Sequence, residues 1–446
     1  MDNIIQGTPS KTFFIEMITR DISIKDAILD LIDNSIDGAN KLNETDYSGL
    51  YIKLVINQSE FVIEDNCGGF SLDIAKKYAF RFGRPDDAPE SKGSIGRFGI
   101  GMKRALFKIG NVFEVESKTE HNHFQINVNV AEWKNKFKTI TDKNKNIKIE
   151  DWDFTYSDIT EETRNLQQNG TYIKVHSLNK EVSDIFNNEF LNALRNDIQR
   201  LLNFSLEKGI SIILNGCPLE SKNLSIFRGQ SQPYYFNTQR NHVKIKIFAG
   251  IAEVGEPKKS GWYIYCNDRL VVEADQSELT GWNTQSIPKW HMDYVMFRGI
   301  VFMDSDDTFN LPLTTTKKGI DSTSDVYKVA LQQMREATLS ILPFMKNVAK
   351  LGNEANEYRL LLGEQEEKIN VVELKSTTLS HDSKRFISPV LNLEKIAQKK
   401  DWVRVSYSIK KSVGEEAKLS SGSKSFSELG QYTFNYYLEM EGIDNE

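Results

Sequence analysis

The stretch "AILDLIDNSIDGAN", residues 27–40, decides the fold because it separates apolar and acidic side chains into two rows. At about 100° per residue, a helix over residues 22–40 places the apolar side chains on one face and a polar row on the opposite face. The polar row consists of Asp26, Asp30, Asp33, Asn34 and Asp37. Like charges at i,i+3 and i,i+4 destabilise a helix by roughly 0.2–0.5 kcal/mol each. The row therefore fits either a solvated helix face, where water screens it, or a face neutralised by a bound cation.

Length and composition predict an ordinary globular protein. The chain has 446 residues, of which 39% are hydrophobic and 26% charged, which suits two or three domains. The net charge of −6 gives no global attraction to nucleic acid, so DNA binding would need local basic patches. Cys67, Cys217 and Cys266 lack the spacing of a zinc site or a disulfide framework. Without an apolar run long enough for a membrane or a recognisable leader, we expect a cytoplasmic protein.

The order of helical and strand-like patterns predicts two packed domains and a polar C-terminal extension. Helices and strands mix over the first part, a helical stretch ends at Gly209, and a strand-rich part follows. Near the end, "KKSVGEEAKLSSGSKS" has the composition of a flexible connector, and "FSELGQYTFNYYLEME" fits a short packed helix. The predicted units are a first domain at 1–185, a linking helix at 186–209, a second domain at 210–352, and a partly flexible extension at 353–446.

Two further segments carry glycines next to polar side chains. In "FVIEDNCGGF", residues 61–70, a strand pattern ends at Asp65 and meets Gly68 and Gly69. In "KGSIGRFGIGMKRALFKIG", residues 92–110, four glycines lead into a helical pattern, an arrangement that lets backbone N–H groups approach phosphate. Each segment alone is compatible with plain loop chemistry, and neither the GxxxxGK[ST] phosphate loop nor a dinucleotide fingerprint is present.

Taken in this order, the acidic helix, the Asp-Gly-Gly turn and the GxxGxG segment before a helix resemble the GHKL ATPases. That superfamily includes gyrase B subunits, MutL, the ninety-kilodalton heat-shock chaperones, histidine kinases and MORC proteins. The sequences "DLIDNSIDGA" and "IGRFGIGMKRA" are most similar to the MORC-like and chaperone-like branches. The resemblance covers roughly residues 10–180. It implies an α+β protein with a Bergerat-type α/β sandwich that binds ATP and Mg²⁺, followed by a transducer domain similar to a ribosomal-protein fold.

The resemblance assigns roles to residues of the acidic helix and the turn after it. Asp30 is the expected general base, and Asn34, one turn away on the same face, is the expected Mg²⁺ ligand. Asp37 and Gly38 would line the pocket one turn further along. Asp65 would accept a hydrogen bond from the adenine amino group.

Further site residues follow from the same resemblance. Gly69 would leave room for the base, and Thr171 in "GTYIKV" would support Asp65 through its hydroxyl and a water. Residues 81–101 would form a lid over the phosphates, and its nucleotide-binding members would be Gly96, Phe98, Gly99, Ile100 and Gly101. In "FNLPLTTTKKGID", residues 309–321, Lys317 would reach the γ-phosphate from the second domain, with Lys318 as the second choice. Lys103 is an alternative anion partner within the first domain, and a solvated loop is the plain reading of the lysine pair.

Two departures from the family pattern bear on turnover. The base is usually Glu, and Asp30 is one methylene shorter, so we expect slow hydrolysis. Cys67 stands where the turn usually has its first glycine.

The resemblance implies an ATP-stabilised homodimer that acts as a DNA-associated clamp in genome maintenance or defence against phage, with an operon partner protein as a further expected partner. A lysine-rich segment at 133–152 and a second basic cluster could contact DNA, although a solvated hairpin is the more ordinary reading of the first. The second cluster consists of Lys384, Arg385, Lys395, Lys399, Lys400 and Arg404. Two alternatives stay open: a chaperone-like ATPase with protein clients, and a nucleotide-sensing module with little turnover. No histidine precedes His121, which argues against phosphotransfer to an internal histidine.

Overall fold

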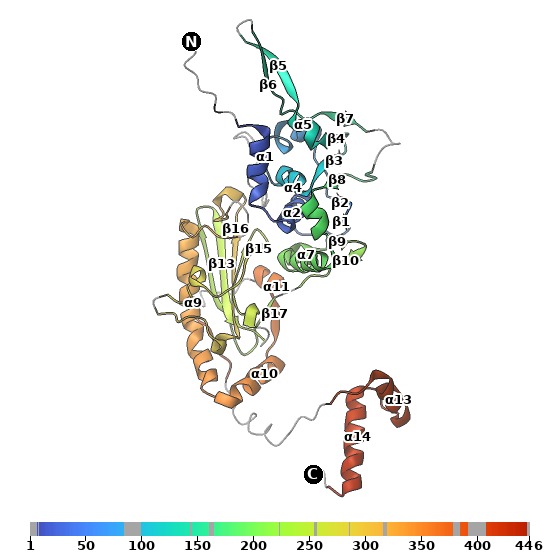
Figure 1. Ribbon diagram of the computed structural model, residues 1–446. Helices are drawn as coiled ribbons and strands as arrows, with labels where there is room; N and C mark the ends of the chain where they lie inside the picture. Colours follow the sequence, from blue (N-terminus) through green and yellow to red (C-terminus); the bar gives the residue numbers. More distant parts are fainter. Residues whose placement is uncertain are drawn as a thin grey trace. The chain divides into compact units, whose positions relative to one another are not determined.

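The computed structural model describes residues 7, 9–83, 100–142, 145–159, 165–222, 224–253, 257–284, 286–314, 319–377, 384–390 and 407–443. The chain forms two compact units, Met1–Val390 and Leu391–Glu446. The larger unit contains an eight-stranded sheet and a five-stranded sheet, which we call the sheets of the first and second domains (Figure 1).

The first domain is built on the eight-stranded sheet, with the strand order β10-β9-β1-β2-β8-β3-β4-β7. Its strands are β1 (Tyr51–Ile56), β2 (Glu60–Asp65), β3 (Gly110–Lys118), β4 (His123–Asn129), β7 (Tyr156–Asp158), β8 (Gly170–Leu178), β9 (Ser211–Leu214) and β10 (Cys217–Pro218). All neighbouring strands are antiparallel except β1 and β9, which are parallel. Alternate side chains of β1 and β2 are buried, as the period-2 pattern predicts.

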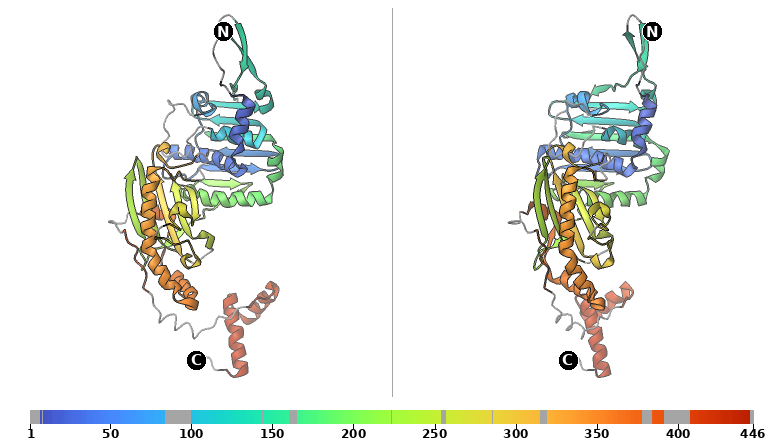
Figure 2. Two further views of the ribbon diagram at one scale, coloured as in Figure 1. Left: turned by 60° about the vertical axis from the view of Figure 1, so that its left-hand side comes forward. Right: turned by 90° about the vertical axis from the view of Figure 1, so that its left-hand side faces the viewer.

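Helices of the first domain pack together over this sheet and bury its core (Figure 2). They are α1 (Lys11–Arg20), α2 (Ile24–Leu42), α3 (Leu72–Ile74), α4 (Gly101–Ile109), α5 (Val130–Lys134), α6 (Lys180–Ile185), α7 (Asn188–Leu201) and α8 (Asn203–Glu207), with a π-helical turn at Ala75–Ala79. Helix α2 contains most of the predicted acidic helix. The side chain of Ser23 accepts a hydrogen bond from Asp26 N and caps its first turn.

The lysine-rich segment forms a two-stranded hairpin, β5 (Phe137–Asp142) and β6 (Lys145–Glu150), which projects from the first domain (Figure 1). Lys136 and Lys138 pair with Asp151, and Lys138 also pairs with Asp153. Acidic partners thus neutralise part of this basic segment, as expected for a solvated hairpin.

The second domain is a five-stranded sheet with the order β12-β13-β16-β14-β15, and the long helix α9 (Asp325–Ala349) packs along it (Figure 1). The strands are β12 (Tyr234–Arg240), β13 (Val243–Ile251), β14 (Gly261–Cys266), β15 (Arg269–Asp275) and β16 (Phe297–Asp304). Strands β14 and β15 are joined by Asn267 and Asp268, both with positive φ, as a tight hairpin turn requires. The carboxyl end of β14 and the start of β15 are thereby fixed.

The domain limits differ from the sequence prediction at two places. Strands β9 and β10, predicted as the start of the second domain, extend the sheet of the first domain instead. The short apolar strand β9 pairs with β1, which is distant in the sequence, and the local sequence pattern does not reveal this pairing. Residues after 352, predicted as an extension, continue the second domain: they form α10 (Ala355–Gln365), β17 (Lys368–Asn370) and α11 (Val371–Ser376). β17 pairs with β11 (Ser225–Phe227), and Val371 and Leu374 are buried in the core beside it.

The smaller unit contains α13 (Lys411–Ser421) and α14 (Phe426–Glu441). The first was predicted as a flexible connector and is a helix, which ends at Gly422 in the left-handed conformation. The second was predicted as a packed helix. Within this unit it buries Leu429 and Leu438, while its tyrosines at 432, 436 and 437 are exposed.

Candidate nucleotide site

Asp65 lies at the end of β2, and its carboxylate is held by three hydrogen bonds. Its oxygens accept hydrogen bonds from Ser35 Oγ at 2.7 Å, Cys67 N at 2.9 Å and Thr171 N at 3.2 Å. A carboxylate has about four acceptor positions, so these three bonds fix its orientation and leave capacity for one more donor. Burial raises the pKa of Asp65 to about 6, and the three hydrogen bonds oppose that shift.

These contacts bring three of the predicted segments together. Ser35 belongs to α2, so its hydroxyl ties the acidic helix to the end of β2. Thr171 stands opposite Asp65 in the β2–β8 register and contributes its backbone N–H. The hydroxyl-and-water contact predicted for Thr171 stays a prediction.

Glycines allow the three segments to approach closely. A Cβ on Gly38 would lie 2.6 Å from Cys67 O, so α2 packs directly on the turn after β2. Gly69 has φ +63°, and a Cβ there would lie 2.4 Å from Lys118 O and 2.6 Å from Gly170 O. The structure thus explains Gly69 by backbone packing between β3 and β8. The predicted room for the base at Gly69 stays untested.

The side chains of the polar row of α2 differ in their exposure to solvent. Asn34 is exposed and Asp37 is half-buried, whereas Asp30 and Asp33 are buried. An exposed amide one turn from a carboxylate suits a Mg²⁺ ion that takes one protein ligand and completes its shell with phosphate and water oxygens. Among the described residues, no cluster of three His, Cys, Asp or Glu residues is arranged to hold a metal by itself.

Arginines neutralise the two buried carboxylates of the row. Arg104 of α4 donates to Asp30 Oδ2 from Nη2 at 2.6 Å and from Nε at 3.2 Å. Arg269, the first residue of β15, places Nη1 3.1 Å from Asp33 Oδ1. Arg269 Nη1 makes no aligned hydrogen bond, so this contact is an ion pair only. The second contact joins the second domain to α2 at the residue beside Asn34.

The start of α4 lies against Asp30. A Cβ on Gly101 would be 3.4 Å from Asp30 Oδ2, and Ile100 precedes it as the residue that caps the helix. Lys103, the predicted alternative anion partner, is buried and donates to Ala79 O at 2.6 Å. Burial lowers the pKa of Lys103 to about 7.

Four predicted site residues lie outside the described residues. Gly96, Phe98 and Gly99 belong to 84–99, and Lys317, with its neighbour Lys318, belongs to 315–318. The ends of the second segment are described: Leu313 and Ile320 form an antiparallel bridge.

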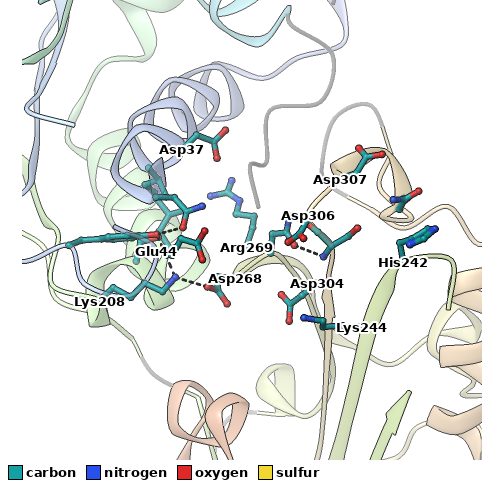
Figure 3. Close-up of a pocket in the computed structure, with 18 of the residues that line it drawn as sticks. Asp37, Glu44, Lys208, His242, Lys244, Asp268, Arg269, Asp304, Asp306 and Asp307 are labelled. Carbon is teal, nitrogen blue, oxygen red and sulfur yellow. Dashed lines mark hydrogen bonds and ion pairs between the residues drawn. The ribbon is translucent and has the colours of Figure 1, made fainter. Parts of the chain in front are cut away.

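A separate cavity of about 460 Å³ lies between the C-terminal half of α2 and the second domain (Figure 3). Asp30, Asn34 and Asp65 are not among its lining residues. Its ionisable lining residues are Asp37, Glu44, Lys208, His242, Lys244, Asp268, Arg269, Asp304, Asp306 and Asp307. Lys208 pairs with Asp268 at 2.9 Å, and Lys375 of α11 pairs with both Asp268 and Asp304. The β14–β15 turn is therefore held from α11 and from the residue that follows α8.

Sequence reasoning did not identify Arg269 and passed over Arg104 in favour of Lys103. The Asn-Asp pair between two strand patterns is a recognisable hairpin signal, and it would have placed Arg269 at the start of β15. Arg104 follows Lys103 directly in the sequence, but its spacing from Asp30 does not indicate that the two residues pair.

A mixed sheet, an acidic helix on its face, and a buried carboxylate at a strand end beside a glycine turn together form an α/β sandwich. Residues 22–180 match the family described as histidine kinase-, DNA gyrase B-, and HSP90-like ATPase. This match identifies residues 22–180 as a GHKL-type ATPase domain, and such a domain supports ATP binding and hydrolysis in general. No curated protein matches the chain. In the described parts of the chain, no helix is both long and apolar enough to cross a bilayer.

Proposed function

We propose that this chain is a Mg²⁺-dependent, MORC- or MutL-like ATPase that acts as a DNA-associated clamp in genome maintenance or phage defence. ATP would switch the conformation of the lid and of a homodimer. The observation that carries the nucleotide assignment is Asp65: a buried carboxylate, oriented by three donors, that keeps acceptor capacity for an adenine amino group.

The residues of α2 would serve the phosphate end of the nucleotide. Asn34 would hold Mg²⁺, which when bound offsets the negative charge of the phosphates. Asp30 would take the proton of the attacking water, and Lys317 would contact the γ-phosphate. Asp37 and the lid residues would enclose the ligand.

The contact between Arg269 and Asp33 supports transmission of the nucleotide state to the second domain. Asp33 neighbours Asn34, so a displacement of this turn of α2 on metal binding would act directly on the β14–β15 hairpin. A buried ion pair transmits such a displacement because separating its charges is costly.

A second candidate function, a nucleotide sensor with little turnover, is favoured by one observation. Asp30 is already paired with the guanidinium of Arg104, and a paired carboxylate is a weak base.

The decisive experiment measures molar mass by light scattering, with and without a non-hydrolysable ATP analogue and with and without duplex DNA. The clamp predicts a dimer with the analogue and DNA binding that strengthens with it and weakens with salt. Asp65→Asn is the control, because it changes the adenine acceptor and leaves the phosphate side intact. A monomer under all conditions would refute the clamp. Client-stimulated hydrolysis without DNA binding would favour the chaperone alternative, and nucleotide binding with unchanged turnover in Asp30→Asn would favour the sensor.

A further inference from the structure

Arg104 pairs with Asp30 through one carboxylate oxygen instead of two. Two donors of one guanidinium, Nη2 and Nε, both converge on the same oxygen, Asp30 Oδ2, at 2.6 and 3.2 Å. The arginine side chain is 10% exposed and the aspartate side chain 6%. A buried ion pair is held strongly as long as both partners are present, and its separation needs a replacement charge.

A bound triphosphate would supply that replacement charge. Arg104 is the fourth residue of α4, and its N–H bonds to Ile100 O within the first turn. The first residue of the same helix, Gly101, lies against Asp30. The N–H groups of the first turn of a helix favour anions, and in α4 this turn begins at Gly101. Phosphate oxygens bound there would meet the guanidinium of Arg104.

A guanidinium is also suited to the exchange. Its planar fork matches both carboxylate and phosphate, and the charge persists at every relevant pH. A phosphate with more than one negative charge competes well with a single carboxylate for the same donors.

We propose that Arg104 is a phosphate-sensing residue that exchanges partners: it pairs with Asp30 in the nucleotide-free protein and binds terminal phosphate oxygens when a triphosphate enters. The exchange separates Asp30 from the guanidinium of Arg104, and Asp30 then acts as the base. Water oxygen then bonds to the γ-phosphorus, the bond from that phosphorus to the bridging oxygen breaks, ADP leaves with the electron pair, and Asp30 accepts a proton from the water. The inference rests on the proposed function and adds the rule that the base is available only when a terminal phosphate is bound.

The exchange predicts a competition that a merely structural ion pair would not produce. In Asp30→Asn, Arg104 is no longer engaged by a charge, so the triphosphate should bind about tenfold more tightly. In Arg104→Gln, the triphosphate should bind about tenfold more weakly. The double variant should resemble Arg104→Gln, because the gain from Asp30→Asn needs the arginine.

The test is calorimetry of the full chain with Mg²⁺ and two probes, a non-hydrolysable ATP analogue and inorganic tripolyphosphate. Lys25→Gln is the matched control, since it removes a different ion-paired cation near the start of α2, the partner of Asp197. Arg104→Lys should keep part of the affinity. Thermal unfolding reports whether each variant is folded, and the double variant leaves no unpaired charge, so it serves if Arg104→Gln does not fold.

The outcomes separate the two proposals. If the ATP analogue binds but Asp30→Asn binds it no more tightly than the wild type, Arg104 does not exchange partners. If tripolyphosphate binds with the predicted order of variants and the ATP analogue does not bind, the exchange stands and the proposed ATPase function fails. If neither probe binds the wild type, both are refuted.

Discussion

Replacing Arg269 with alanine should weaken the connection between the second domain and α2 more than any loss of a surface ion pair. The Asp33 side chain is 1% exposed and the Arg269 side chain 8%, and their charged atoms are 3.1 Å apart. At an effective dielectric constant of about 20, such a pair attracts by roughly 5 kcal/mol before desolvation. Truncation leaves Asp33 buried without this partner, so we expect a loss of about 3–5 kcal/mol.

Hydrogen exchange of the α2 amides, together with urea unfolding, measures this loss. A change of about 3 kcal/mol in the opening free energy corresponds to roughly 150-fold faster exchange in residues 24–42. Lys328→Ala is the control, because Lys328 forms an exposed pair with Asp325 in the second domain and its removal should cost less than about 1 kcal/mol. The double variant Asp33→Ala/Arg269→Ala should lose less than the sum of the two single variants. Unchanged exchange in Arg269→Ala, or additive losses in the double variant, would show that the pair does not couple the domains.

Three further substitutions test the site. The pKa of Asp65 is raised to about 6, above the ordinary value of 3.8 for an aspartate, so its contribution to stability is present below about pH 4 and is lost as pH rises to 6. In the wild type, the free energy of unfolding in urea should therefore fall by about 3 kcal/mol across this pH range, and Asp65→Asn should remove that fall. Parallel pH curves for the variant and the wild type would contradict this prediction. The pKa of Lys103 is lowered to about 7, so the stability of the folded protein should rise with pH above 7. Lys103→Met should flatten that rise in thermal melts at pH 7–9. A rise that persists in the variant would show that another group causes it. Gly69→Ala should destabilise the protein by more than about 2 kcal/mol, because the new Cβ would meet Lys118 O. The control Gly49→Ala, also at positive φ but in open space, should cost about 1 kcal/mol. Equal denaturation midpoints for the two variants would refute the packing role of Gly69.

The elements of the first domain could be predicted because their signals are local. Each signal is visible within a short stretch of sequence. These signals are the amphipathic period of residues 27–40, the alternation of buried side chains in β1 and β2, and the glycines with positive φ at 68 and 69. The family resemblance then supplied the convergence of α2, Asp65 and the start of α4.

The ion pairs of α2 could not be predicted in the same way. Asp30 and Arg104 are separated by 74 residues, and Asp33 meets an arginine from another domain. The sequence separation of each pair does not identify the two partners. A row of carboxylates also has the same sequence pattern whether water, a metal ion or arginines neutralise it. The parallel pairing of β9 with β1 and the packing of α11 were missed for the same reason, since each depends on contacts between distant segments.

The return of the chain to β9 and β10 after α7 and α8 has a practical consequence for anyone who wishes to isolate the nucleotide domain. Ending the chain at residue 185 or 209 would strip two strands from the sheet and leave the backbone of β1 as an open edge. Such an edge recruits other strands and favours aggregation. A fragment that ends beyond Pro218 keeps the sheet complete, so the shorter fragments should precipitate where the longer one stays in solution.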